Sequence, residues 1–339
     1  GDLVTARARA EDSTALIRSG KNLKSYSGFF TIDESTNSNL FFWFFPAQEN
    51  PEKAPVILWV NDVPGYSSLE GVFLETGPFE LEENNVVKDR NVSWTKSHSM
   101  LYIDAPVGTG FSFAANEDAY ANNSDEEAVE IYEALKQFFT LFSDFQPRDF
   151  YLAGETYAAT LIPYVARHID QENAKSDVKI NLKGFVIGSP YFDPQQNLDR
   201  AQTLYNFGLI DTEQKKQFDD VMSKGTAEIN KGNIIEGTGL FWSTIIGPGS
   251  LLENTTGFTD FRNILRDKPP LDTGKFQKFI DAQEVHNYLH VGLHKFITKD
   301  PKVYSRFGKE FVALHEDVIQ EMLDKGYRIL FYAAQFDIV

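Results

Sequence analysis

Short apolar runs recur along the chain and alternate with longer segments that have the periodicity of helices. Runs of this length, bounded by turn-forming residues, are typical of buried strands. They predict strands at residues 41–45, 56–60, 100–104, 150–153, 184–187 and 329–333. Strands that alternate with helices are typical of a mostly parallel sheet with helices on its faces. The pattern therefore predicts an α/β fold.

The clearest helical pattern extends from about residue 125 to residue 142. Its apolar residues recur at spacings of three and four, and Ser124 or Asp125 is the expected cap. The same rhythm continues from Ala158 to Ile169. Further helices are predicted at residues 212–224, 286–297 and 305–325.

The pattern changes between residues 192 and 281. Charged helices are followed there by a glycine-rich, aromatic stretch at 232–249, and no core strand is evident. We expect this segment to be an insertion that caps the sheet. The core would then consist of residues 1–191 and 282–339.

The net charge of the chain and the length of its apolar runs argue against some classes of function. The chain has 339 residues, which suffice for a large core, and 49 acidic against 32 basic residues give a net charge of −17. This charge, without any basic cluster, disfavours nucleic acid as a partner. The longest apolar run, residues 40–45, is far too short for a membrane helix, so no span is expected. We also expect no metal and no other cofactor.

Three glycosylation sequons bear on location. Asn91, Asn122 and Asn254 each begin an Asn-x-Ser/Thr motif in polar, turn-like surroundings. Residues 1–13 lack the apolar core of a signal peptide, which fits a cytosolic chain or one already trimmed. The absence of cysteine opposes an extracellular location, because extracellular chains often carry disulfides. The sequons favour a secreted or lumenal glycoprotein.

A candidate nucleophile lies in Gly154-Glu155-Thr156-Tyr157-Ala158, between a predicted strand and a predicted helix. A turn with a nucleophile between small residues exposes a hydroxyl above the sheet of a hydrolase. The motif is weak by itself, because many ordinary helices begin in the same way. Its context decides between the two readings.

Three further segments precede this turn, and together with it they form a series in a fixed order. The members of the series are WVNDVPGYSS at 59–68, the segment 69–78, YIDAPVGTGFS at 102–112 and the turn itself. The series resembles the serine carboxypeptidase family, from about residue 24 to the end of the chain. SNLFFWFFPAQ at 38–48 and HVG at 290–292 look most similar to its vitellogenic-like branch. The resemblance implies an α/β-hydrolase fold, peptides with a free C-terminal carboxylate as ligands, and a secreted, lysosomal or vacuolar location.

The resemblance also implies roles for individual positions. Thr156 matches the nucleophilic serine, Asp337 matches the triad acid, and the backbone N–H of Tyr157 matches one oxyanion donor. The second donor matches Val63, in a loop where the family's two glycines are replaced by Asp62 and Val63. A carboxylate and a β-branched residue there would both oppose catalysis.

Asn61, Glu75 and Glu155 match the positions that hold the substrate's terminal carboxylate in the family. Two facing glutamates share a proton, because like charges close together do not both ionise cheaply, and this favours acidic pH. The alternative is that Glu75 is a solvated charge and that Glu155 complements a helix dipole.

The family's triad histidine follows the aspartate along the chain. All six histidines precede Asp337 here, and we expect each to be a surface or packing residue. The sequence ends at Val339, so a C-terminal segment or a second chain is expected to supply the histidine, if anything does.

Three interpretations remain open. The first is a catalytically inactive carboxypeptidase-like protein that acts by binding, storage or assembly. The second is an active acid carboxypeptidase or acyltransferase completed by a further segment. The third is that some residues of the sequence are misread, which the absence of cysteine leaves open.

Overall fold

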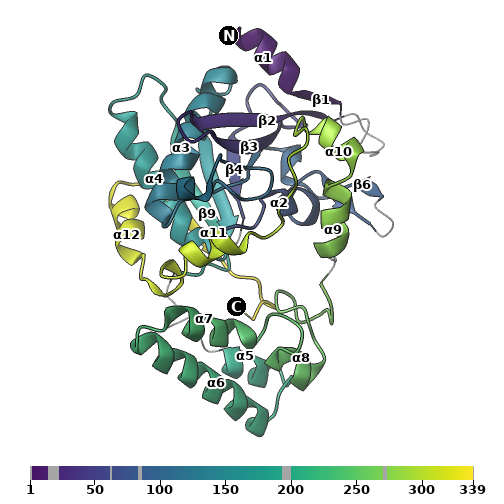
Figure 1. Cartoon of the computed structure of the whole chain (residues 1–339), viewed down its shortest axis with the longest axis vertical. Coiled ribbons are helices and arrows are strands. Elements are labelled where there is room, and N and C mark those ends of the chain that lie inside the picture. The colour runs from purple at the N-terminus through teal and green to yellow at the C-terminus, as the bar shows by residue number, and fades with distance from the viewer. Residues whose placement is uncertain are drawn as a thin grey trace.

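The computed structural model describes residues 2–13, 23–61, 63–82, 86–192, 200–269 and 273–338. Its centre is an eight-stranded sheet with the strand order β1-β2-β3-β7-β4-β8-β9-β10, and β5 pairs with β6 beside it (Figure 1). The strands are β1 (Glu11–Ser13), β2 (Lys24–Asp33), β3 (Ser38–Phe45), β4 (Val56–Val60), β5 (Phe79–Leu81), β6 (Val87–Asp89), β7 (Ser99–Ile103), β8 (Phe150–Glu155), β9 (Leu182–Gly188) and β10 (Arg328–Tyr332).

The sheet is mixed: one side of it is antiparallel and the other side is parallel. β1, β2, β3 and β7 pair antiparallel, whereas β7, β4, β8, β9 and β10 pair parallel. The predicted α/β fold with a mostly parallel sheet is therefore confirmed, and all six predicted strands are present. β2 was not predicted, because Ser25, Ser27 and Gly28 interrupt its apolar pattern.

Alternate side chains of each central strand enter different cores. Leu40, Phe42 and Phe44 of β3 join the core that α3 and α4 cover. Phe41 and Trp43, between them, join the core that α2 and α9 cover. Figure 1 shows these two helix pairs on opposite sides of the sheet. Burial on both faces accounts for strands that read as continuous apolar runs.

Twelve α-helices flank or cap the sheet within the described part of the chain. They are α1 (Leu3–Ala10), α2 (Leu69–Leu74), α3 (Ser124–Leu141), α4 (Ala158–Asn173), α5 (Arg200–Asn206), α6 (Thr212–Asn230), α7 (Ile234–Ser243), α8 (Leu251–Thr256), α9 (Thr273–Ile280), α10 (Gln283–Tyr288), α11 (Pro301–Arg306) and α12 (Glu316–Asp324). None of the described helices combines the length and the apolar character that crossing a membrane requires.

Several helix boundaries differ from the prediction. The cap of α3 is Asn123, whose side chain accepts from the Glu126 N–H, and not Ser124 or Asp125. The predicted helix at 286–297 is wrong: α10 ends at Tyr288, and His290 and Gly292 adopt positive φ.

The predicted helix at 305–325 is also wrong, because two separate helices occupy this region. Asp300 caps α11 with Pro301 at its first turn, and α11 ends at Arg306. α12 begins only at Glu316.

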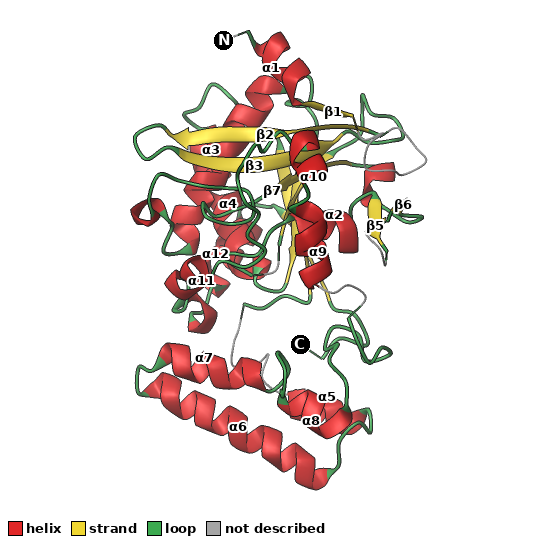
Figure 2. Ribbon diagram, turned by 45° about the vertical axis from the view of Figure 1, so that its right-hand side comes forward, coloured by secondary structure: helices red, strands yellow, loops and turns green. Residues whose placement is uncertain are grey.

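Helices α5 to α8 form a layer beyond the carboxyl ends of the parallel strands (Figure 2). They have an apolar cluster of their own, which includes Leu204, Phe218 and Leu252. α7 forms inside the glycine-rich stretch, where no helix was expected. α9 instead packs Phe276 into the sheet core. The cap boundaries 192–281 stay a prediction, and residues 193–199 and 270–272 of that range lie outside the described residues.

Candidate active site

The turn at Thr156 has the geometry of an exposed elbow. β8 ends at Glu155, Thr156 adopts a φ of +51°, and α4 begins at Ala158. A β-branched residue in the left-handed region is strained, at about 1–3 kcal/mol. The end of β9 holds this conformation, because the Thr156 N–H donates to the Gly188 carbonyl at 2.9 Å.

Gly154 allows the helix to approach the strand. A Cβ atom at this position would lie 2.5 Å from the Ala158 Cβ and 2.7 Å from the Val60 carbonyl oxygen. Neither contact can be relieved by rotating a flexible side chain. The glycine is therefore required by the close packing of α4 on β8 and β4.

A cavity of about 160 Å³ opens beside Thr156 at the carboxyl ends of β8, β9 and β10. It brings together three residues that the sequence predicted as site residues: Glu155, Thr156 and Asp337. The other lining residues are Gly188, Ser189, Phe261, Arg262, Tyr332 and Ala334. The cavity therefore combines the elbow, two neighbouring strand ends and a segment of the predicted cap.

Ser189 ties the aspartate to the sheet. Its hydroxyl donates to the Asp337 carboxylate at 2.7 Å, and its N–H donates to the Tyr332 carbonyl at 2.7 Å. Ser189 also has a positive φ, +42°. The sequence analysis missed Ser189, although its position directly after the strand next to the elbow could have indicated it.

The predicted carboxylate-binding residues gather at the same sheet edge. Pairing of Val60 with Gly154 sets Asn61 next to Glu155, and the buried Asn61 amide donates to the Ser67 carbonyl at 2.9 Å. Burial raises the pKa of the Tyr332 phenol, and the charges of Glu155 and Glu75 raise it further. Both glutamates therefore lie near Tyr332, a residue that the sequence analysis did not assign to the site.

Glu75 ends α2 in a turn that Arg90 holds. The Arg90 guanidinium donates to the Phe73, Phe79 and Gly77 carbonyls at 2.6, 3.0 and 3.1 Å. Burial lowers the pKa of Arg90, and the charges of Glu80, Tyr102 and Glu75 oppose this effect. The backbone on both sides of Glu75 is thus fixed.

Asp104 joins two loops behind the site. Its carboxylate accepts from the Ser67 hydroxyl at 2.6 Å, the Ser68 N–H at 3.1 Å and the Phe111 N–H at 3.0 Å. Burial raises the pKa of this carboxyl to about 7.

A second buried carboxyl, that of Glu130, accepts from the Val107 N–H at 2.8 Å, and burial raises its pKa to about 8. The segment that contains Val107 and Phe111 is therefore anchored by carboxyl groups that keep their protons at acidic pH.

Little space is present beside Tyr157 and Val63, the two positions that match the oxyanion donors. Tyr157 is buried, and Val63 packs against the apolar cluster that contains the Tyr157 ring. A cavity of about 10 Å³ lies between residues that include Asn61, Val63 and Tyr157, which is near the minimum for one water molecule. Asp62, the other predicted substitution in this loop, lies outside the described residues.

No histidine is among the residues that line the 160 Å³ cavity. Five of the six histidines make ring contacts elsewhere or bind neighbouring groups, and His98 lies 2.9 Å from the Ser97 hydroxyl. These contacts pair His168 with Tyr132, His286 with Phe111, His290 with Ser27, His294 with Phe113 and His315 with Tyr164. They agree with the expected surface or packing roles.

The predicted glycosylation positions Asn91, Asn122 and Asn254 are all exposed. Their modification stays a prediction. Among the described residues, no group of three or more His, Asp or Glu side chains is arranged to hold a metal ion.

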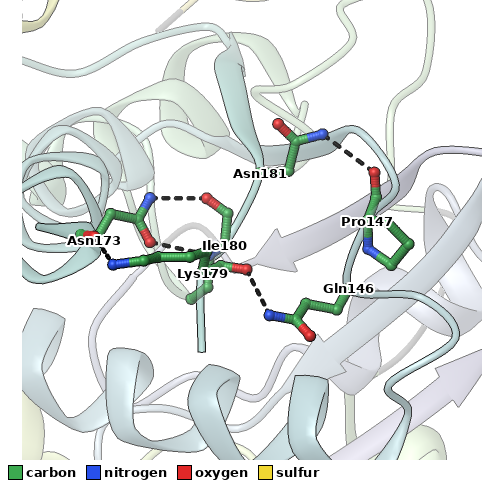
Figure 3. Close-up of a pocket in the computed structure, with 6 residues that line it drawn as sticks. All are labelled: Gln146, Pro147, Asn173, Lys179, Ile180 and Asn181. Carbon is green, nitrogen blue, oxygen red and sulfur yellow. Dashed lines mark hydrogen bonds between the residues drawn. The ribbon is translucent and has the colours of Figure 1, made fainter. Parts of the chain in front are cut away.

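A larger hollow, of about 750 Å³, lies at the opposite edge of the sheet (Figure 3). Its polar groups pair with one another: Asn173 exchanges hydrogen bonds with Ile180 at 2.8 and 2.9 Å, and the Gln146 amide donates to the Lys179 carbonyl. Amides and carbonyls that are already paired offer no nucleophile and no proton transfer. The candidate active site is therefore the smaller cavity.

Comparison with known proteins agrees with this geometry. A family model described as serine carboxypeptidase matches residues 17–339. The probable serine carboxypeptidase CPVL of Homo sapiens is 40% identical over 331 residues, which cover 94% of this chain and 68% of that protein. The venom serine carboxypeptidase of Apis mellifera is 39% identical, with coverage of 94% and 69%.

The vitellogenic carboxypeptidase of Aedes aegypti is 35% identical, with coverage of 100% of this chain and 72% of that protein. Among solved structures, KEX1(DELTA)P, a prohormone-processing carboxypeptidase from Saccharomyces cerevisiae, superposes with a TM-score of 0.77. That alignment covers 98% of this chain and 79% of the other at 21% identity, so it bears on the fold alone.

Proposed function

Because the chain belongs to the serine carboxypeptidase family, we propose that it keeps a pocket for the carboxyl terminus of a peptide but has lost serine-type hydrolysis. In this proposal it acts by binding, storage or assembly. The observation that carries the proposal is the residue type at the elbow: an internal threonine, Thr156, lies at the position that matches the family's nucleophilic serine.

Two physical arguments support the loss of hydrolysis. Threonine nucleophiles are activated mainly by their own terminal amine, and Thr156 is internal. The packed, β-branched Val63 is the second argument, since it limits the space for a developing oxyanion.

The grouping of Asn61, Glu75 and Glu155 supports peptide binding. Glu75 and Glu155 lie close enough to Tyr332 to raise the pKa of its phenol together. A pair of carboxyls that shares a proton accepts a third carboxylate more readily at acidic pH. We therefore expect binding of peptides with a free C-terminal carboxylate to strengthen as the pH falls from 7 to 5.

A secreted, lysosomal or vacuolar location suits an acidic-pH binder, and glycans at the exposed Asn91, Asn122 and Asn254 would fit it. Treatment of the purified natural protein with peptide N-glycosidase should lower its mass if these positions carry glycans. An unchanged mass would remove the support that the sequons give to this location.

The test separates binding from turnover. The unmodified full-length protein is incubated with blocked dipeptides at pH 4 to 7, and products are separated by chromatography, alongside Thr156→Ser. Binding is measured with a labelled peptide as the free acid and as the amide. We expect no turnover by the unmodified protein and tighter binding of the free acid. Turnover by the unmodified protein would refute the loss of hydrolysis, and equal binding of acid and amide would refute the pocket.

One observation favours the alternative, an active acid carboxypeptidase or acyltransferase. The elbow keeps its left-handed backbone, and Asp337 lies in the same cavity as Thr156. Labelling of the full-length protein by a fluorophosphonate probe, lost in Thr156→Ala, would support this alternative.

A further inference from the structure

A buried carboxyl group outside the proposed peptide pocket lies beneath the loop 63–67. Glu127, on α3, is 1% exposed, and its carboxyl oxygen Oε2 has no hydrogen-bond partner among the described residues. Glu127 lines the cavity of about 10 Å³ that also borders Val63, Tyr66 and Tyr157. Its carboxyl group therefore lies where the loop, α3 and the start of α4 meet.

The groups that face Glu127 from these helices disfavour a negative charge. Burial raises the pKa of Glu127 well above its ordinary value of 4.5. The charges of Glu130, three residues further along α3, and of Glu310, in the short 3₁₀ helix η5 (Glu310–Val312), raise it further. Burial and the charges of Glu127 and Glu310 also raise the pKa of the Tyr157 phenol. An ionised Glu127 would thus face two acidic groups and a neutral phenol.

The loop 63–67 is held on its other side by contacts of a different kind. Two backbone hydrogen bonds, of 3.0 and 3.4 Å, connect it to the segment 298–300. The Lys299 ammonium lies 5.1 Å from the centre of the Tyr66 ring. The Ser67 hydroxyl donates to the Asp104 carboxyl at 2.6 Å. Glu127 is therefore the titrating group on the side of the loop that faces α3.

The cavity is too small to hydrate an ionised carboxylate. Its volume is near the minimum for one water molecule, whereas a carboxylate accepts several hydrogen bonds. A buried charge without such bonds is strongly unfavourable, and the neighbouring acidic groups add to the cost. Protonated Glu127 fits beneath the loop, but ionised Glu127 favours a conformation in which the loop moves away and water enters.

We infer that Glu127 is a pH-sensitive positioning residue, which holds the loop 63–67 against α3 when it is protonated and releases the loop when it ionises. The closed conformation binds the proton, so closure is complete at acidic pH and is lost as the pH rises through the raised pKa of Glu127. Asn61, directly before this loop, lines the same cavity and belongs to the proposed pocket. Release of the loop should therefore also weaken peptide binding.

The test measures hydrogen–deuterium exchange of the full-length protein at pH 5.5 and pH 8 by mass spectrometry. Rates for peptides that contain residues 63–67 are divided by the intrinsic rate at each pH, and peptides from β8 serve as the internal reference. The variants are Glu127→Gln and, as a matched control with the same change on the same helix, Glu133→Gln, whose carboxylate pairs with Lys136 at 2.6 Å. Thermal unfolding of each variant verifies that the fold is retained.

We expect the loop to exchange at equal rates in the unmodified protein and in Glu127→Gln at pH 5.5. At pH 8 it should exchange about tenfold faster in the unmodified protein, because each pKa unit gained on closure changes the opening equilibrium tenfold. Glu133→Gln should behave as the unmodified protein does. Asp104 is present in every variant, so its own titration cancels in the ratio.

A ratio that is the same at both pH values would overturn the inference. So would loop protection in the unmodified protein that does not change between pH 5.5 and pH 8, a result that requires no variant.

Peptide binding gives a second readout, which rests on the proposed function. Glu127→Gln should bind a labelled free-acid peptide as the unmodified protein does at pH 5.5 and more tightly than the unmodified protein at pH 8. Equal affinities at pH 8 would overturn the link between Glu127 and the pocket. Absence of peptide binding at both pH values would refute the proposed function, and the exchange ratios would still decide the role of Glu127 in the loop.

Discussion

The cavities at the two edges of the parallel sheet differ in volume and in the chemical groups that line them. The hollow at the amino edge (Figure 3) is the larger, with about 750 Å³ against about 160 Å³ for the cavity at the carboxyl edge. The amino-edge hollow is lined by amides, carbonyls and the Lys179 ammonium, which pair with one another. The carboxyl-edge cavity is lined by residues that carry three hydroxyls, two carboxylates and a guanidinium, from different parts of the chain. The candidate site is therefore identified by the reactive groups that lie together in the cavity, and not by the volume of the cavity.

Backbone strain follows the same division. Thr156 and Ser189 both have positive φ and both line the carboxyl-edge cavity. No lining residue of the amino-edge hollow is among the described non-glycine residues with positive φ. Strained residues persist only where surrounding structure fixes them, and they concentrate at functional sites.

The largest expected effect is a fall in stability as pH rises, which originates behind the carboxyl edge. Burial raises the pKa of Asp104 from 3.8 to about 7 and that of Glu130 from 4.5 to about 8. The folded protein therefore binds more protons than the unfolded chain between pH 4 and pH 8, and stability is lost across this window. At ~1.4 kcal/mol per pKa unit, each group contributes on the order of 4 kcal/mol, so the free energy of unfolding should fall on the order of 9 kcal/mol for the two together.

Chemical denaturation at several pH values measures this slope. Asp104→Asn removes one titrating group and should flatten the slope in part. A wild-type stability that stays constant or increases from pH 5 to pH 8 would show that these carboxyls are not buried as described.

The next largest effect is expected from Gly154→Ala. The added methyl group would lie 2.5 Å from the Ala158 Cβ of α4 and 2.7 Å from the Val60 carbonyl oxygen, so α4 has to shift away from the sheet. Overpacking of this kind should cost about 3 kcal/mol in the free energy of unfolding. Gly239→Ala in α7 is the matched control, because a methyl group there meets no atom within 4 Å and should leave stability unchanged or increased. Equal effects of the two substitutions would contradict the close packing at the elbow.

A smaller effect of opposite sign is expected from Thr156→Gly. Glycine adopts a φ of +51° without steric strain, so the free energy of unfolding should rise by about 1 kcal/mol. Thr140→Gly, within α3, should instead lower it, since glycine is unfavourable in a helix. Destabilisation by both substitutions would mean that Thr156 is not strained.

The smallest effect is expected from Lys179→Met at the amino edge. The exposed Lys179 ammonium donates to the Asn173 carbonyl, and its loss should change the free energy of unfolding by less than ~0.5 kcal/mol. Binding of labelled peptides should not change. A weakened peptide affinity would show that the amino-edge hollow also takes part in function.

Local sequence patterns predicted the elements that carry the elbow. Apolar runs flanked by turns indicated β4, β8 and β9, and the glycine turn indicated Thr156. Pattern alone failed where polar residues lie inside an element, as in β2, or where glycines occur inside a helix, as in α7. Tertiary packing decides such segments, because intrinsic preference is weak there.

Residues that act through contacts between distant segments could not be predicted in this way. Ser189 meets Asp337 across 148 positions of the chain. Tyr332 reaches Glu155 because two strand pairings, Gly188 with Tyr332 and Glu155 with Gly188, set them in one row. Arg262 lines the cavity because its neighbours Phe261 and Ile264 form backbone bonds with Ile338 and Phe336. Sequence spacing carries no signal for Tyr332 or Arg262, and for Ser189 it gives only the position directly after β9.

The backbone bonds between segments 261–264 and 336–338 also limit how a ligand enters. A cap that swung open on a hinge would have to break both bonds and expose their donors. Entry is then governed by rotation of the exposed side chains at the rim, Arg262 and Tyr332, which occurs in picoseconds to nanoseconds. Access to this cavity should therefore be fast and should not require any movement of the layer formed by α5 to α8.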